Sequence, residues 1–594
     1  MKRSISILLA ALLLPMVLQA QYTYTTNKGA LTITSFNGGG AVIIPSTANG
    51  LPVTSIGEDS FEDNFSLTSV TIPYSITNIG EEAFSDCYSM TSVTIGTNVL
   101  DIGGYAFEYC SRLAGVTIPA SVTNIELEAF VSCAALTNLT VAAQNPAYSS
   151  MNGVLFNQGA TILEIYPQAL MGAYSVPASV TNLAEYAFNE CTRLTSITND
   201  NSLASIGSAA FSGCISLTNI TLPGSLTSIS NAAFAFCTNL TSVAIPASVT
   251  NIQTGVFAEC FSLTNCTVAT QNPAYGSVNG VVFDKNQATL IVYPAGLAGA
   301  YVVPASVTSI ADGAFAYCTR LWNITFPDGL TNIGIQSFYE CSSLTNATFP
   351  NSLAGIRASA FYDCTSLRSV SIGNGVTNIG GGAFGACTSL TNAAIGNGVI
   401  SLGDFAFEYC SSLEYASIGN NATNIGLFEF MNCSSLTSIT IGESVASIGA
   451  EAFENCSSLT NLLFLGNSPA TVGYGAFINV NPAATVYYQA GTTGWGTSYG
   501  GAFDAPVNVP AGILPTVMVE NGPPQVLEGN AGVFTNEFGF TITGTSNEVV
   551  VVQVSTNLLN WMPLKTNTLA GTPLIFSDPN WRNFPHRFYR LLGQ

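Results

Sequence analysis

The chain has 594 residues, of which only 8% are charged, with a formal net charge of −21 and one histidine, His586. An ordinary globular protein has about 25% charged residues. A single histidine excludes metal sites built from several histidines. The small number of cations excludes a phosphate-neutralising surface, so we expect no nucleic-acid partner, and it argues equally against an anionic membrane surface.

The N-terminus has the pattern of a secretory signal peptide. Lys2 and Arg3 precede an apolar run from Ile5 to Leu18, and Gln19 and Ala20 follow. We predict a signal peptide over residues 1–20, cleaved after Ala20, and a secreted or cell-surface mature protein. The apolar run is short for a membrane span, and no later segment has 18 consecutive apolar residues, so we expect no membrane insertion of the mature chain.

Cysteine spacing then reveals a repeat. Apart from Cys266, which is out of frame, the steps between successive cysteines from Cys87 to Cys456 equal 23 residues, except for two steps of 58. A fixed period in this range is typical of a solenoid. We therefore predict repeats over 65–456. The boundaries that follow are an N-terminal cap over 21–64, two long units at 134–191 and 261–318, each compatible with two coils of about 29 residues, and a C-terminal cap over 457–505.

Residues 65–87 show how one repeat is built. Apolar and polar residues alternate over 67–72, which predicts a short strand. A second short apolar segment lies at 76–79, and residues 81–87 are interpreted as one helical turn. Stacking of repeats would place Phe84 on the equivalent phenylalanine of the next repeat, with neighbouring strands about 4.8 Å apart.

The repeat cysteines have two interpretations. Neighbouring thiols would lie close enough for disulfides. Every repeat nevertheless offers the same inward-facing thiol among isoleucine and phenylalanine, and a small buried hydrophobe with a weak S–H donor explains that without any chemistry. We expect free buried thiols.

One repeat departs from the pattern. In residues 192–214 the position that other repeats fill with isoleucine holds Asn199. Either this is a polar notch that binds a ligand, or it is a bulge that adjusts to the preceding long unit. We favour the bulge.

Three kinds of segment carry a family resemblance. They are the 23-residue repeat, the inserts NPAYSSMNGVLF at 145–156 and NPAYGSVNGVVF at 272–283, and the cap sequences FLGNSPATVGYGAF at 464–477 and VYYQAGTTGWG at 486–496. Over about 22–505 the chain resembles BspA-like leucine-rich repeat proteins. The resemblance implies a β-rich solenoid and a bacterial surface or secreted protein, in a family of which some members adhere to extracellular-matrix or plasma proteins.

The C-terminal part is different. Prolines are frequent in 506–530, which predicts a linker, and 531–594 predicts a small antiparallel β domain. We predict a contact with a glycan or a cell wall through stacking and cation–π interactions. The candidate residues are Trp561, Trp581, Arg587 and Tyr589. The alternative is that they belong to the core of this domain or to its solvated surface.

The outward positions of the repeat strands form the main candidate binding face. They present hydroxyl and amide groups almost without charge, which suits many weak hydrogen bonds to an extended ligand; the alternative is simple solvation of side chains that favour strands. The candidate residues are Ser69, Thr71, Ser92, Thr94, Asn219, Thr221, Asn323, Thr325 and the aromatic Tyr415. We predict no catalytic residue, no cofactor and no metal site, because a flat uncharged face does not bring perturbed groups together.

These features predict a non-enzymatic extracellular or cell-surface protein that binds or adheres to an extracellular protein or glycan. Two alternatives remain: a structural matrix or surface-layer protein, and a non-catalytic targeting subunit for extracellular glycans. The ligand, the anchoring mode and the oligomeric state do not follow from the sequence.

Overall fold

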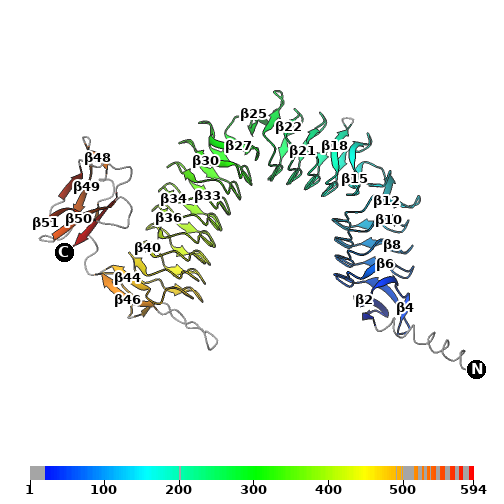
Figure 1. Ribbon diagram of the computed structural model, residues 1–594, viewed down its shortest axis with the longest axis horizontal. Helices are drawn as coiled ribbons and strands as arrows, with labels where there is room; N and C mark the ends of the chain where they lie inside the picture. The colour runs from blue at the N-terminus through cyan, green and yellow to red at the C-terminus, as the bar shows by residue number, and fades with distance from the viewer. Residues whose placement is uncertain are drawn as a thin grey trace, which may run out of the picture.

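The computed structural model describes residues 21–199, 202–489 and 491–496 and, beyond them, the strands between Ser498 and Gly593. The predicted signal peptide lies outside the described residues. Between residues 21 and 496 the chain winds into coils that stack into a curved arch (Figure 1). The described part of the chain contains strands and turns but no helix, and thus none that is long and apolar enough to cross a bilayer.

Each coil contributes one longer strand to a series of parallel ladders, which we call the strand face. Its strands are β3 (Gly40–Ile43), β6 (Leu67–Thr71), β8 (Ser92–Thr94), β10 (Gly115–Ile118), β12 (Asn138–Val141), β16 (Gly172–Val176), β18 (Leu194–Asn199), β20 (Asn219–Thr221), β22 (Ser242–Ile245), β24 (Asn265–Val268), β28 (Gly299–Val302), β30 (Leu321–Thr325), β32 (Asn346–Thr348), β34 (Ser369–Ile372), β36 (Asn392–Ile395), β38 (Tyr415–Ser417), β40 (Ser438–Ile441), β42 (Asn461–Phe464) and β44 (Thr485–Gln489). Side chains alternate between the core and the outside along each strand, as the period of two in the sequence predicts.

A second set of parallel ladders is built from shorter strands. These are β5 (Leu51–Ile56), β7 (Asn78–Ile79), β9 (Asp101–Ile102), β11 (Asn124–Ile125), β17 (Asn182–Leu183), β19 (Ser205–Ile206), β21 (Ser228–Ile229), β23 (Asn251–Ile252), β29 (Ser309–Ile310), β31 (Asn332–Ile333), β33 (Gly355–Ile356), β35 (Asn378–Ile379), β37 (Ser401–Leu402), β39 (Asn424–Ile425), β41 (Ser447–Ile448) and β43 (Thr471–Val472). In the regular repeats, residues spaced 23 apart pair, such as Asn78 with Asp101. The short strands therefore keep the same register from coil to coil.

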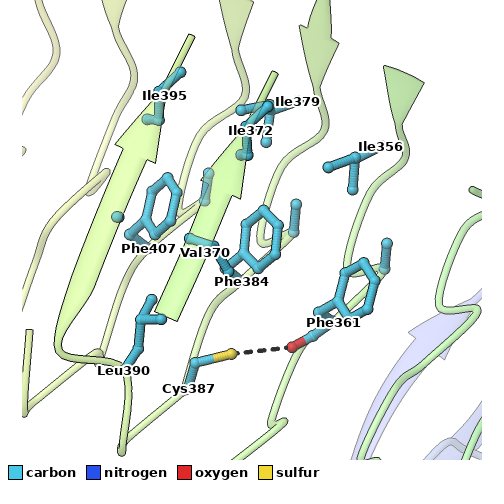
Figure 2. Packing of buried hydrophobic residues seen from close by; sticks show 14 of the residues in the cluster. Ile356, Phe361, Val370, Ile372, Ile379, Phe384, Cys387, Leu390, Ile395 and Phe407 are labelled. Atoms are coloured by element: carbon cyan, nitrogen blue, oxygen red, sulfur yellow. Dashed lines mark hydrogen bonds between the residues drawn. The ribbon is translucent and has the colours of Figure 1, made fainter. Parts of the chain in front are cut away.

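The core between the ladders is a column of phenylalanines. Figure 2 shows Phe361, Phe384 and Phe407 lying face to face, with centroids 5.4 and 5.3 Å apart. Their interplanar angles are 5° and 12°. Each ring is fully buried. The predicted stacking of phenylalanine on phenylalanine is confirmed.

The segment that precedes each repeat cysteine is not the predicted helical turn. In residues 81–87, Glu82 and Asp86 adopt left-handed backbone angles, with φ of 52° and 58°. The N–H groups of Glu82, Phe84 and Asp86 donate to carbonyls of the next coil at 2.8–2.9 Å. A helix would direct these groups along its own axis, so the bonds between coils replace the helical ones. The same pair of left-handed positions recurs, one and five residues before the cysteine, in the other repeats.

All fifteen cysteines are buried and free. The thiol of Cys387 lies 3.2 Å from the carbonyl oxygen of Phe361 in the preceding coil and donates a hydrogen bond to it (Figure 2). Equivalent bonds recur along the column, for example from Cys87 to Phe61. The thiol thus fills a small apolar space and also satisfies a buried carbonyl.

Threonine hydroxyls tie adjacent coils together at the edges of the ladders. Thr77 donates to the carbonyl oxygen of Thr54 at 3.2 Å, and Thr331 donates to that of Thr308 at 2.9 Å. Both partners lie 23 residues earlier in the chain. At these positions an uncharged hydroxyl therefore makes the contact between neighbouring coils that a charged side chain makes in other proteins. This explains much of the low charge of the chain.

Each long unit contains two coils and an inserted hairpin, so the number of coils is confirmed. The equal division into coils of about 29 residues is wrong, because Ala173 pairs with Ser196, 23 residues later, and the insert therefore lengthens only the first coil. The inserts are β13 (Tyr148–Met151), β14 (Val154–Asn157) and β15 (Ile162–Ile165) in the first unit, and β25 (Tyr275–Val278), β26 (Val281–Asp284) and β27 (Thr289–Val292) in the second. After each insert a tyrosine replaces phenylalanine in the column. Tyr166 stacks on Phe188 at 4.8 Å, and Tyr293 stacks on Phe315 at 4.7 Å.

A buried asparagine fixes each insert. Asn145 is 3% exposed; its amide donates to the carbonyls of Pro119 and Val122 at 2.8 and 2.9 Å. Its side-chain oxygen accepts from the N–H groups of Ala147 and Tyr148. Asn272 makes the equivalent bonds in the second unit. This network explains the asparagine of the N-P-x-Y sequence.

The inserted strands also divide the core into three clusters. In β14, Leu155 packs in the N-terminal cluster, whereas Val154 and Phe156 pack in the central one. In β26, Val282 packs in the central cluster and Val281 in the C-terminal one. Alternate side chains of one strand point to opposite faces, so each of these strands is a partition between two parts of the core.

Hairpins and added strands occupy both ends of the coil stack. β1 (Tyr22–Asn27) and β2 (Ala30–Phe36) form an antiparallel hairpin whose Phe36 ring lies tilted against that of Phe61, with centroids 4.9 Å apart, and β4 (Thr47–Ala48) pairs with β5. At the other end, β46 (Leu514–Val519) pairs in parallel with β44 and antiparallel with β45 (Ser498–Tyr499). Thus part of the range predicted as a linker extends the strand face.

The C-terminal residues form two antiparallel sheets, as predicted for the small β domain. One contains β47 (Gln525–Val526), β48 (Gly532–Phe534), β49 (Glu537–Thr543) and β52 (Leu574–Asp578). The other contains β50 (Val549–Ser555), β51 (Met562–Thr568) and β53 (Phe588–Gly593). Pro563 of β51 pairs with Gln553, where the register between β50 and β51 shifts.

Asn199 lies at the end of β18 and pairs with Val176. The register irregularity between β16 and β18 falls at Gly172 and Ala173, at the opposite end of the pair. The bulge expected at Asn199 is therefore not found there, and the irregularity at Gly172 and Ala173 recurs at Gly299 and Ala300 in the second long unit.

Candidate functional site

The strand face carries the predicted binding residues on five of its strands. Ser69 and Thr71 lie on β6, Ser92 and Thr94 on β8, Asn219 and Thr221 on β20, Asn323 and Thr325 on β30, and Tyr415 on β38. The second residue of each of the four pairs is exposed, and Tyr415 is half-buried. The predicted residues thus share a face of the arch without converging on one point.

Parallel register arranges these side chains in rows. Ser69 pairs with Ser92, and Thr71 pairs with Thr94. The rows continue where Thr325 pairs with Thr348. Paired residues of adjacent parallel strands lie about 4.8 Å apart, so each row presents polar groups at a regular short spacing. That arrangement suits a partner with its own extended series of hydrogen-bonding groups.

Sequence reasoning missed the most exposed aromatic residue of this face. Trp322 on β30 is 53% exposed and stands where the next repeat has Thr345. The signal was available, because an indole in a threonine position is unusual. Tyr415, which the sequence had singled out, is less exposed.

The residues predicted for the C-terminal contact lie almost entirely outside the part of the chain that the structure describes. Trp561, Trp581 and Arg587 lie outside the described residues. Tyr589 belongs to β53 and its backbone pairs with Val554; its side chain also lies outside the described part. The contact predicted for these four residues stays a prediction.

The turn segments, defined as the six residues that end at each repeat cysteine or at the equivalent Asn64, form a ridge along the arch together with the residue that follows each segment. Acidic residues that look scattered in the sequence meet there. Burial raises the pKa of Glu62, and the carboxylates of Asp59, Asp63, Glu82 and Asp86 raise it further. The sequence does not show this acidic cluster directly, because its residues come from neighbouring coils and lie about one repeat apart in the chain.

Tyrosine and phenylalanine rings share the ridge with these acids. Phe65 stacks on Tyr88 at 5.4 Å, and Tyr339 stacks on Tyr362 at 5.6 Å. Tyr88 is 42% exposed. The ridge therefore has a mixed acidic and aromatic surface, unlike the uncharged strand face.

The ridge is interrupted at the first long unit by a groove of about 880 Å³. Tyr109, Ile215 and Phe236 contribute its apolar lining. Its polar lining includes Gln168 and Glu190, among other hydroxyl and amide groups. The volume lies within the ~300–1,000 Å³ of sites for small ligands. No sequence motif pointed to this groove.

Nothing in the described geometry assembles a metal centre. No group of three or more histidine, cysteine, aspartate or glutamate side chains is placed to hold a metal ion among the described residues. The thiols are poor ligands as they stand, because burial raises the pKa of groups such as Cys133 to about 12.

Comparison with known proteins identifies the repeat. The model of the BspA-type leucine-rich repeat region matches residues 42–155, 166–280, 299–411 and 383–498. The chain belongs to the BspA-type leucine-rich repeat family. No curated protein matches it.

Solved structures of bacterial leucine-rich repeat proteins resemble the chain. A leucine-rich cell surface protein of Faecalibacterium prausnitzii is 29% identical, with 67% of this chain and 92% of that one covered and a TM-score of 0.38. A leucine-rich repeat protein of Eubacterium ventriosum is 22% identical, with 78% and 94% covered and a TM-score of 0.37. The pneumococcal vaccine antigen PcpA is 19% identical, with 77% and 96% covered and a TM-score of 0.36.

Proposed function

We propose that this protein is a secreted or cell-surface binding protein without catalytic activity, and that its strand face contacts an extracellular protein or glycan. The observation that carries the proposal is the set of uncharged polar rows on parallel strands, in which Thr71 lies beside Thr94. Such rows offer many weak, regularly spaced hydrogen bonds over an extended area.

Three further points support it. The family includes proteins of the bacterial surface, one of them the F. prausnitzii cell surface protein. The first 20 residues have the pattern of a signal peptide. The strands described for the strand face contain no Asp, Glu, Lys, Arg or His, the residue types that most often carry acid–base catalysis.

The test is a binding screen of the mature chain against arrays of extracellular-matrix proteins, plasma proteins and glycans. Thr71→Arg combined with Thr94→Arg places two long cations side by side in one row and should reduce binding at least tenfold. Asn251→Arg, at an exposed position on the short strand β23, is the control and should leave binding unchanged. Equal binding by both variants would refute the assignment to the strand face.

A further inference from the structure

The groove at the first long unit exists because one coil lacks its turn segment. In a regular coil, residues 80–91 lie between the short strand β7 and the next long strand β8. In the inserted coil, only residues 166–171 connect β15 to β16. This short connection contributes no turn segment to the ridge, and the gap that it leaves is the groove. Gln168 of the connection lies in the groove lining.

Partly exposed apolar side chains line this gap. Tyr109, from the coils before the insert, is 44% exposed. Ile215 and Phe236, from the coils after it, are 42% and 46% exposed. An exposed ring that borders a polar cavity offers a stacking surface for the apolar face of a ligand ring.

The polar part of the lining is held in place by hydrogen bonds across the gap. The hydroxyl of Ser132, 9% exposed, donates to a carboxylate oxygen of Glu190 at 2.8 Å, although the two residues are 58 apart in sequence. The side-chain amide of Gln168 donates to the carbonyl oxygen of Asn189 at 3.2 Å. These bonds fix donors and acceptors before any ligand arrives, which reduces the entropy lost on binding.

Charge narrows the class of ligand. Glu190 and Arg193 are the charged residues of the lining. Glu108 lies close by, and its carboxyl has a raised pKa because of burial and of the acidic side chains around it, among them Glu128 and Glu190. This negative surrounding disfavours an anionic ligand.

The second long unit provides an internal comparison. It repeats the first with an offset of 127 residues, so Glu190 corresponds to Tyr317 and Ser212 to Tyr339. The two tyrosine rings contact each other edge to face, with centroids 5.5 Å apart. The fold therefore accommodates two large rings at the positions where the first unit has Glu190 and Ser212.

We propose that the groove bordered by Tyr109 and Phe236 binds a neutral oligosaccharide. Sugar rings present an apolar face for stacking and hydroxyl groups for hydrogen bonds with hydroxyl, amide and carboxylate side chains. A groove with exposed rings beside a polar lining and little charge has both features. The site is separate from the strand face and is independent of the function proposed above.

The experiment measures binding of cellotetraose, xylotetraose, mannotetraose, maltotetraose and N-acetylchitotetraose to the mature chain by titration calorimetry and saturation-transfer NMR. Tetragalacturonate is the anionic comparison. We expect at least one neutral tetrasaccharide to bind with a Kd below about 5 mM, more tightly than tetragalacturonate. Absence of binding by all five neutral probes, or tighter binding of the anionic one, would overturn the proposal.

Two pairs of variants locate the site. Tyr109→Ala should weaken binding at least tenfold, whereas Tyr409→Ala should not. Tyr409 is 47% exposed and has the same position in its repeat and the same left-handed backbone as Tyr109, with φ of 56° and 51°. The control therefore removes an equivalent ring outside the groove.

The second pair fills the groove with the residues of the second unit. Glu190→Tyr combined with Ser212→Tyr should abolish binding, and Ala386→Tyr, which adds a ring at the position of Glu190 in another repeat, should not. Circular dichroism and thermal midpoints confirm that all variants fold. Retention of full affinity by the filled variant would contradict the assignment, whatever the strand-face variants show.

Discussion

Glu429 makes part of the arch sensitive to pH. It takes the position that most other coils fill with alanine, its side chain is fully buried, and neither carboxylate oxygen has a hydrogen-bond partner. Burial raises the pKa of this carboxyl well above its usual value, and the nearby Asp404 raises it further. The backbone N–H of Ala406 lowers the pKa of Glu429 in part, although it does not lie in hydrogen-bond geometry with either carboxylate oxygen. The folded chain therefore keeps a proton that the unfolded chain loses at lower pH.

The direction of the effect follows from this difference. An unfolded glutamate titrates near pH ~4.3. Because the folded pKa of Glu429 is higher, the surrounding coils have their full stability below that pH. They lose stability as the pH rises towards the folded pKa, by up to about 1.4 kcal/mol per pH unit. Glu429→Gln keeps the size of the side chain and removes this dependence.

Glu429→Ala should stabilise the same coils at pH 7. Each unsatisfied buried polar group costs about 1–3 kcal/mol, and the variant removes both oxygens, while the loss of buried methylene groups offsets part of the gain. We expect a net increase of about 2 kcal/mol in the free energy of local opening.

Hydrogen exchange measured by mass spectrometry is the suitable assay, because long repeat arrays do not unfold in one cooperative step. Peptides from residues 404–456 report on Glu429, and peptides from 337–387 are the internal reference. Rates are corrected for intrinsic exchange at pH 5, 6, 7 and 8. The explanation is refuted if wild type and Glu429→Gln show the same pH dependence of opening in peptides 404–456.

Three further predictions concern the packing of coils. Gly398→Ala should destabilise the protein by at least about 2 kcal/mol, because its Cβ would lie 1.9 Å from the carbonyl oxygen of Asn374; Gly224→Ala, with no atom within 4 Å of its Cβ, is the matched control for the thermal midpoint. Asn145→Ala should lower the free energy of local opening, measured by hydrogen exchange of its coil, by about 3 kcal/mol, since it leaves two buried carbonyls without their donor; a cost below about 1 kcal/mol would show that water replaces the amide. Thiol titration without reductant should find no reactive thiols in the native protein at pH 8 and all fifteen after denaturation. A substantially lower number of thiols in denaturant would reveal disulfides.

The repeating part of this fold is readable from the sequence. The 23-residue spacing of Phe84, Phe107 and their equivalents predicts the aromatic column, because stacked coils place identical positions on top of one another. The strand residues follow from their period of two. The position of Tyr166 in the column was less visible, because the insert before it breaks the spacing.

Conformation within the turn segments was not readable. The A-F-x-x-C pattern is compatible with a helical turn as well as with the observed left-handed positions. What decides between them is the set of N–H groups that bond to the neighbouring coil, such as that of Phe84 to Ala106, and a single repeat does not contain its partner. The groove has the same origin, since it depends on which turn is missing between two coils that are far apart in sequence.

The partition strands have a mechanical consequence. Because Val154 and Leu155 face different core clusters, the arch has three blocks with separately packed cores. The coils on either side of the first partition are joined by that strand and by hydrogen bonds such as Ser132 to Glu190. Pulling on the two ends would open one block while the others keep their packing. We therefore expect extension in three force steps, each releasing the length of chain in one block. A molecule of this kind yields to tension gradually and retains folded surface while it lengthens.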